Sequence, residues 1–169
     1  MKAILQNIKN TAHIWSNVVF PIAGIASGSL EIFFAFLLLG LSSFVAHWKR
    51  GEWWEADWAG MYIAFTAIIL VNFGVGMFIF PLTPFIVWLT YTKLEETTYF
   101  FIGTLWIVSM FSAYVAGTAF LPALIAFALA YYLRQRQPNI DQPGYNLFHS
   151  LWHVFAAIGM YLLVYKLLF

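Results

Sequence analysis

The chain has 169 residues, of which 63% are hydrophobic and 9% are charged. Soluble domains carry about 25% charged residues, so this composition predicts an integral membrane protein with a single domain, residues 1–169, and no separate soluble part. The net charge of +1, without a basic cluster, gives no sign of nucleic-acid binding. Because cysteine is absent from the sequence, disulfides and thiolate metal sites are excluded, and a metal ion would need His, Asp, Glu or water as ligands.

Charged residues mark the ends of the predicted membrane-spanning helices. Asn10–Leu30 is uncharged and long enough to span a bilayer, so we interpret it as a retained first helix, although Lys2 and Lys9 before it also suit a signal peptide. The predicted second helix is Ile32–Trp48, and a polar segment that begins at Lys49 follows it.

Two longer apolar stretches must each contain a turn. As one helix, Trp58–Thr92 would be ~52 Å long, against a hydrocarbon core of ~30 Å. We expect it to turn at Gly74–Gly76, which gives a third and a fourth helix. Thr97–Leu133 is too long for the same reason, and a turn near Gly117 would give a fifth and a sixth helix.

The last predicted helix is Leu147–Tyr165, after a loop at Arg134–Asn146 that is rich in Pro, Gln and Asn. The predicted fold class is therefore all-α integral membrane, a seven-transmembrane helix bundle. Seven spans place every basic residue except Lys166 on the side of the N-terminus: Lys2, Lys9, Lys49, Arg50, Lys93, Arg134 and Arg136. By the positive-inside rule, the N-terminus is cytoplasmic and the C-terminus is outside.

Two histidines, His149 and His153, lie four residues apart at the start of the last predicted helix. This spacing puts both rings on one helix face, with Cβ atoms about 6 Å apart. Two imidazoles in this arrangement can hold one metal ion, as they do in the HExxH motif. The pair also fits two interfacial histidines that cap a membrane helix.

Three further polar residues are expected at the same membrane depth. His47 ends the second helix, Ser43 lies one turn before it, and Asp57 opens the third helix. Each has another explanation when taken alone: His47 can reach water at the interface, Ser43 can bond to its own backbone, and Asp57 can cap its helix. Together with the histidine pair, they predict one polar site at the cytoplasmic end of an apolar protein.

Three neutral imidazoles with an open coordination position are typical of catalytic zinc, whereas structural zinc sites have four protein ligands. The open position takes a water, whose pKa the metal lowers to ~7. Asp57 is then the predicted general base or acceptor for that water, and Ser43 a donor to the water or to a developing oxyanion. The pattern predicts hydrolysis of a carbonyl bond in a lipid that enters from the bilayer. Zn²⁺ is the expected ion, with iron and manganese as alternatives.

At these residues the chain resembles a known family, the alkaline ceramidase branch of a seven-helix hydrolase superfamily that also includes adiponectin receptors, progestin receptors and myomaker-type proteins. The matching segments are Gly40–His47 with its S-x3-H core, Asp57, His149–His153, and Ile14–Phe20 with its Ser-Asn pair. The resemblance implies zinc ligands at His47, His149 and His153 and active-site residues at Ser43 and Asp57. It also implies cleavage of the amide of an N-acyl sphingoid base, which yields a fatty acid and a long-chain amine.

The sequence also departs from that family. Animal alkaline ceramidases have an acidic N-terminal segment associated with calcium, and this chain has no acidic residue before Glu31, so no such calcium site is expected. The chain is also short for that branch. His13 is interpreted as an interfacial histidine, and Glu52 or Glu55 would replace Asp57 as the carboxylate if the third helix began elsewhere.

Two other functions remain open from the sequence. In a non-catalytic protein of the myomaker type, the metal would be structural, and Asp57 would be its fourth ligand. In a transporter, Asp57 and the histidines would relay protons, although the polar residues gather at one face and form no path across. Tight loops favour a bacterial inner-membrane location with the metal site near the cytoplasmic face. The oligomeric state, the acyl chain and the head group of the lipid are not determined by the sequence.

Overall fold

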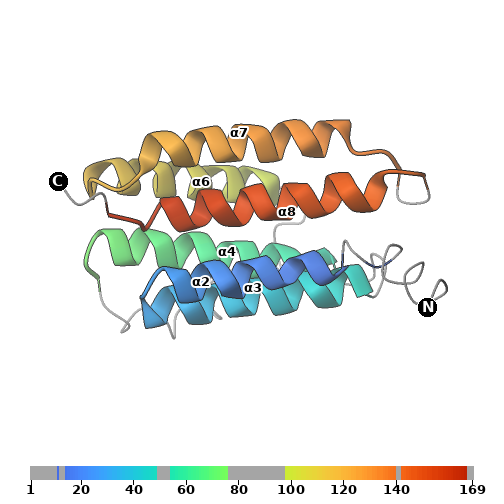
Figure 1. The fold of residues 1–169 in the computed structure, drawn as a ribbon. Coiled ribbons are helices and arrows are strands. Elements are labelled where there is room, and N and C mark those ends of the chain that lie inside the picture. The colour runs from blue at the N-terminus through green and yellow to red at the C-terminus, as the bar shows by residue number, and fades with distance from the viewer. Residues whose placement is uncertain (1–10, 12–13, 49–53, 76–97, 140–141, 167–169) are drawn as a thin grey trace.

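The protein is all-α over the residues that a computed structural model describes, namely 11, 14–48, 54–75, 98–139 and 142–166 (Figure 1). In chain order the elements are the 3-10 turn η1 Ser16–Val18 and the helices α2 Val19–Ala26, α3 Leu30–Trp48, α4 Trp54–Asn72, α6 Thr98–Val115, α7 Phe120–Arg136 and α8 Tyr145–Leu162. Within these residues, the only β-type pairing is an isolated bridge between Thr118 and Lys166.

The structure has turns at two positions that the sequence predicts. Gly74 and Gly117 both have positive φ, near +68° and +67°, a conformation that glycine adopts without steric cost. They follow the ends of α4 and α6, so each long apolar stretch is broken as expected. The predicted fourth helix lies outside the described residues.

One predicted loop is partly wrong, because α7 continues to Arg136 instead of ending at Leu133. Arg and Gln are good helix formers, so the polar residues after Leu133 extend the helix. Helix α7 ends at Arg136 because Pro138 pushes the preceding Gln137 into an extended conformation with ψ of 126°. The last helix begins at Tyr145, directly after Gly144 with φ of +92°.

The helices run roughly parallel or antiparallel to one axis, which brings distant ends of the sequence together (Figure 1). α3 packs against α4 and α2, α7 packs against α8, and α2 also contacts α8. The C-terminal end of α3 and the N-terminal end of α8 lie at the same end of the bundle (Figure 1). At the other end, Nδ2 of Asn72 donates hydrogen bonds to Ser112 Oγ, at 3.1 Å, and to the Leu163 carbonyl, at 3.0 Å.

Close contact between α3 and α4 depends on Gly60. A Cβ atom at this position would lie 2.9 Å from the Leu39 Cα and would overlap Ser42 Oγ. Gly60 is one turn beyond Asp57, so the close approach of the two backbones positions Asp57 against α3.

We expect Gly60→Ala to destabilise the protein by about 1–3 kcal/mol, because the added methyl group must push the two helices apart. The measurement is the unfolding midpoint in detergent. The matched control is Gly103→Ala in α6, where a Cβ would meet no atom within 4 Å. Equal midpoints for the two variants would contradict this explanation of the α3–α4 contact.

By length and composition, one helix of the described chain, α3, is suited to crossing a membrane. Three other apolar segments are shorter: Ser16–Ala26, Ala56–Asn72 and Ile102–Val115. The remaining helices carry polar residues, with Arg134 and Arg136 in α7 and two histidines in α8. The prediction of seven spans therefore remains a prediction.

Candidate metal centre

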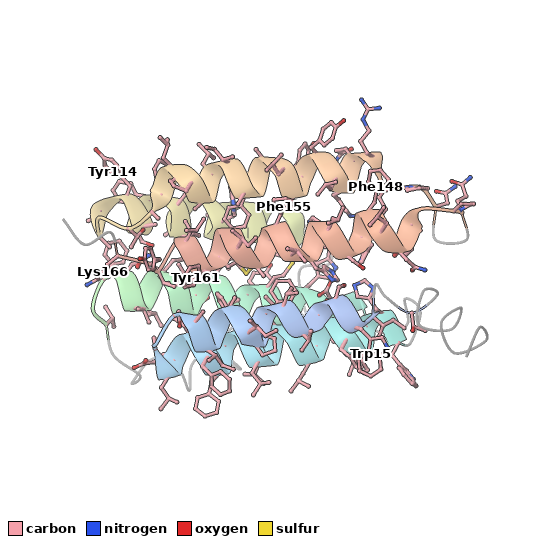
Figure 2. The ribbon with its side chains drawn as sticks, viewed as in Figure 1. Trp15, Tyr114, Phe148, Phe155, Tyr161 and Lys166 are labelled. Carbon is pink, nitrogen blue, oxygen red and sulfur yellow. The ribbon has the colours of Figure 1, made fainter. Side chains whose placement is uncertain are left out.

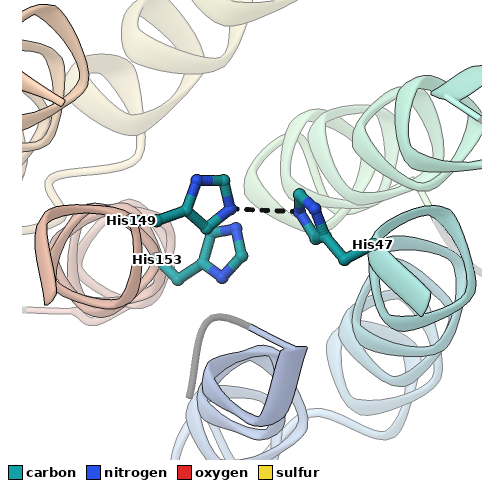
Figure 3. A group of neighbouring side chains, drawn as sticks. All are labelled: His47, His149 and His153. Atoms are coloured by element: carbon teal, nitrogen blue, oxygen red, sulfur yellow. Dashed lines mark hydrogen bonds between the residues drawn. The ribbon is translucent and has the colours of Figure 1, made fainter. Parts of the chain in front are cut away.

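Three histidines from two helices meet inside the bundle (Figure 3). His47 comes from the last turn of α3, and His149 and His153 come from the first half of α8. All three are buried, with exposed fractions between 1% and 4%. One ring nitrogen from each lies within 4.8 Å of the other two, so the triad can hold a metal ion.

The nitrogen positions fit the edge of a small coordination polyhedron. Nε2 of His149 lies 3.1 Å from Nε2 of His47. Two nitrogens that each bind zinc at about 2.0–2.1 Å in tetrahedral geometry are roughly 3.3 Å apart. The pair is therefore close to the spacing of two zinc ligands, and a ring nitrogen of His153 lies within 4.8 Å of both.

The local sequence explains how α8 presents its two histidines. The i, i+4 spacing places them on one face of the helix, directed toward His47 of α3 (Figure 3). The ring of Tyr145, one turn earlier, stacks on His149 with a centroid distance of 5.2 Å. The Trp152 ring lies 4.7 Å from that of His153, and Arg134 sits over Trp152 at 5.6 Å. Aromatic neighbours therefore limit the rotation of both imidazoles.

Two polar side chains contact the outer nitrogens of this pair. Nδ1 of His149 lies 3.0 Å from Oε1 of Gln137, just beyond the end of α7. Nδ1 of His153 lies 2.8 Å from Oγ of Ser16 in η1. Both η1 and the residue after α7 thus touch the triad without contributing a ring.

Ser43 and Asp57 form a second polar pair beside the triad. Ser43 is buried one turn before His47, and its hydroxyl donates a hydrogen bond to the Asp57 carboxylate. The Arg134 guanidinium also attracts this carboxylate. Asp57 lies in the first turn of α4, after Trp54, so it does not cap the helix.

Among the described residues, the group that could hold a metal consists of the three histidines, and Asp57 is not part of it. In this conformation Asp57 therefore lies outside the group of possible metal ligands. His13 and Glu52 lie outside the described residues, as does the side chain of Glu55. Ser16 belongs to the Ser-Asn pair seen in the sequence, whereas Gln137 was missed because it fell in a predicted loop.

An apolar pocket of about 180 Å³ opens on the surface next to this end of the bundle. It lies between the first helical segment and α3, and its lining includes the neighbours of Ser16 and Ser43: Trp15, Asn17, Val18, Pro21, Leu37, Gly40, Leu41 and Phe44. The lining of this pocket is thus suited to hydrocarbon, and none of the three histidines is part of it.

Comparisons with protein-family models, with curated proteins and with solved structures find no match to this chain.

Proposed function

We propose that the protein is a membrane-embedded, zinc-dependent hydrolase that cleaves the amide bond of an N-acyl lipid of the ceramide type. The observation that carries the proposal is the buried triad His47, His149 and His153, which gathers one nitrogen from each ring within 4.8 Å. The family resemblance at these residues supports the same chemistry and suggests the substrate class.

The donor set favours zinc. Three imidazoles suit Zn²⁺, and the described residues near them offer no fourth ligand of the His, Asp or Glu type within the same distance. A zinc ion held by three histidines would supply a Lewis acid and would make a water acidic enough to react near neutral pH.

In this proposal, Asp57 accepts a proton from the water that attacks the amide. A carboxylate has the basicity and the lone pairs for this role, and it needs a fixed orientation to perform it. Ser43 supplies that orientation by donating a hydrogen bond to one carboxylate oxygen. Ser43 is thus a positioning residue for the Asp57 carboxylate.

The surroundings of the site support a lipid substrate and a membrane location. α3 has the length and composition of a membrane span, and the apolar pocket between the first helical segment and α3 suits an acyl chain. Arg134 and Arg136 end α7 near the triad, whereas Lys166 lies at the opposite end of the bundle from Trp15 (Figure 2). With a seven-span bundle, this distribution favours a cytoplasmic metal site and, with the tight loops, a bacterial inner membrane.

The test is hydrolysis of N-acyl sphingosine in ¹⁸O-labelled water by the purified protein loaded with zinc. The amide C–N bond breaks, one water oxygen enters the fatty acid, and the long-chain amine leaves with the proton. We expect one ¹⁸O atom per released fatty acid, measured by mass spectrometry. The control is the same protein with His149→Ala and His153→Ala. Release that is equal in both samples, or no release from a panel of N-acyl lipids, would refute the proposal.

A structural metal is the alternative, and the deep burial of the triad is the observation that favours it. All three rings are at most 4% exposed, and a metal between α3 and α8 would hold the two helices together. This reading predicts bound metal, a large loss of thermal stability on its removal, and no turnover in the ¹⁸O assay.

A further inference from the structure

Each of the two α8 histidines has one ring nitrogen engaged by a residue that belongs to another element. Gln137 Oε1 is 3.0 Å from Nδ1 of His149, and Ser16 Oγ is 2.8 Å from Nδ1 of His153. A neutral imidazole carries its proton on only one nitrogen, and the other nitrogen is the one that can bind a metal. The residue that engages Nδ1 therefore decides which nitrogen is available.

An amide oxygen can only accept, so Gln137 Oε1 accepts the proton of the His149 Nδ1–H group. This leaves Nε2 of His149 deprotonated, and Nε2 is the atom that faces His47 at 3.1 Å. The hydroxyl of Ser16 can accept from His153 Nδ1–H in the same way, which leaves Nε2 of His153 as its ligand atom.

We infer that Gln137 and Ser16 are positioning residues that hold His149 and His153 in the tautomer with a deprotonated Nε2, and so set the metal affinity of the triad. Outer partners of metal-bound histidines act by fixing the tautomer and the ring orientation. The inference rests on the metal binding proposed above and is independent of the hydrolytic reaction.

The two contacts also give distant elements a role in the site. Ser16 lies in η1 at the start of the chain, and Gln137 follows the last residue of α7. Neither element contributes a ligand, yet each hydrogen-bonds to one. Metal binding is therefore expected to stabilise the packing of the first helical segment and of α7 on α8.

The test measures zinc affinity by competition with a chromophoric chelator for the full chain in detergent. We expect Gln137→Leu to weaken zinc binding by about 10–100-fold, the usual effect of losing an outer partner. Gln137→Glu should bind zinc at least as tightly as the parent, because a carboxylate is a stronger acceptor for Nδ1–H. Ser16→Ala should also weaken zinc binding, as Gln137→Leu does.

Matched control variants separate this loss of zinc affinity from a general destabilisation of the protein. Gln135→Leu makes the same change at an exposed glutamine of α7, and Ser27→Ala removes a hydroxyl at the far end of α2. Both should bind zinc like the parent. Unchanged affinity in Gln137→Leu and Ser16→Ala would overturn this inference alone. A Gln137→Glu variant as weak as Gln137→Leu would do the same, because it would mean that Gln137 donates to the ring. A parent without zinc affinity would overturn the proposed function as well.

Discussion

Asp57→Asn is expected to lower the turnover of an N-acyl lipid by about 10²–10⁴-fold, the usual contribution of a general base, while zinc remains bound. The amide of Asn keeps the shape of the carboxylate and can still accept a hydrogen bond from Ser43, but it cannot take a proton from water. The measurement is kcat at saturating lipid, together with the zinc content of the same sample.

Glu31→Gln is the matched control for this variant. Glu31 is also an acidic residue in the first turn of its helix, where it accepts a hydrogen bond from Ser29, and α3 carries it at the end opposite to His47. Its loss should leave kcat unchanged. Asp57→Asn with parental turnover would show that another group takes the proton, and loss of zinc would show that Asp57 is a ligand.

His47→Ala is expected to reduce zinc affinity by more than about 100-fold, beyond the range typical of an outer partner, and to reduce turnover to the background rate. His47 is the one ligand that α3 contributes, so its loss leaves two nitrogens on a single helix. The measurements are zinc affinity and release of fatty acid.

Two further samples show whether this loss is specific. His13→Ala changes the one histidine of the sequence that lies outside the triad and has no predicted role in the site. This variant should match the parent in both measurements. The zinc-free unfolding midpoint of His47→Ala shows whether the variant is still folded. A folded His47→Ala protein that binds zinc like the parent would show that His47, and therefore α3, is not part of the metal centre.

Much of the helical framework could be predicted from the sequence, because charges and glycines mark helix ends directly. Gly74 and Gly117 follow α4 and α6 as expected, with the positive φ that glycine allows. The i, i+4 spacing of His149 and His153 also survives in α8, since helical geometry depends on local sequence alone.

The contacts around the histidines could not be predicted in the same way. Gln137 reaches His149 only because α7 continues past Leu133 and stops at Pro138, a boundary that the loop-like composition concealed. The contact between Ser16 and His153 joins residues at opposite ends of the chain, and no local pattern encodes their distance. The bond between Ser43 and Asp57 similarly depends on the close approach at Gly60.

Hydropathy separates α3 from the other described helices, although both α3 and α8 contribute histidines to the site. α3 passes the test for a membrane span, and it places its single histidine at its end. α8 carries two buried histidines in its first half, together with Asn146 and Ser150, and does not pass the same test.

Zinc stoichiometry by plasma emission spectroscopy, on the detergent-purified protein after reconstitution with zinc and removal of excess ion, tests the histidine centre most directly. One equivalent of zinc per chain is expected in the parent, with none retained by a folded His149→Ala/His153→Ala variant. A parent that retains no metal, or a double variant that retains as much as the parent, would contradict the assignment of His47, His149 and His153 as a metal site.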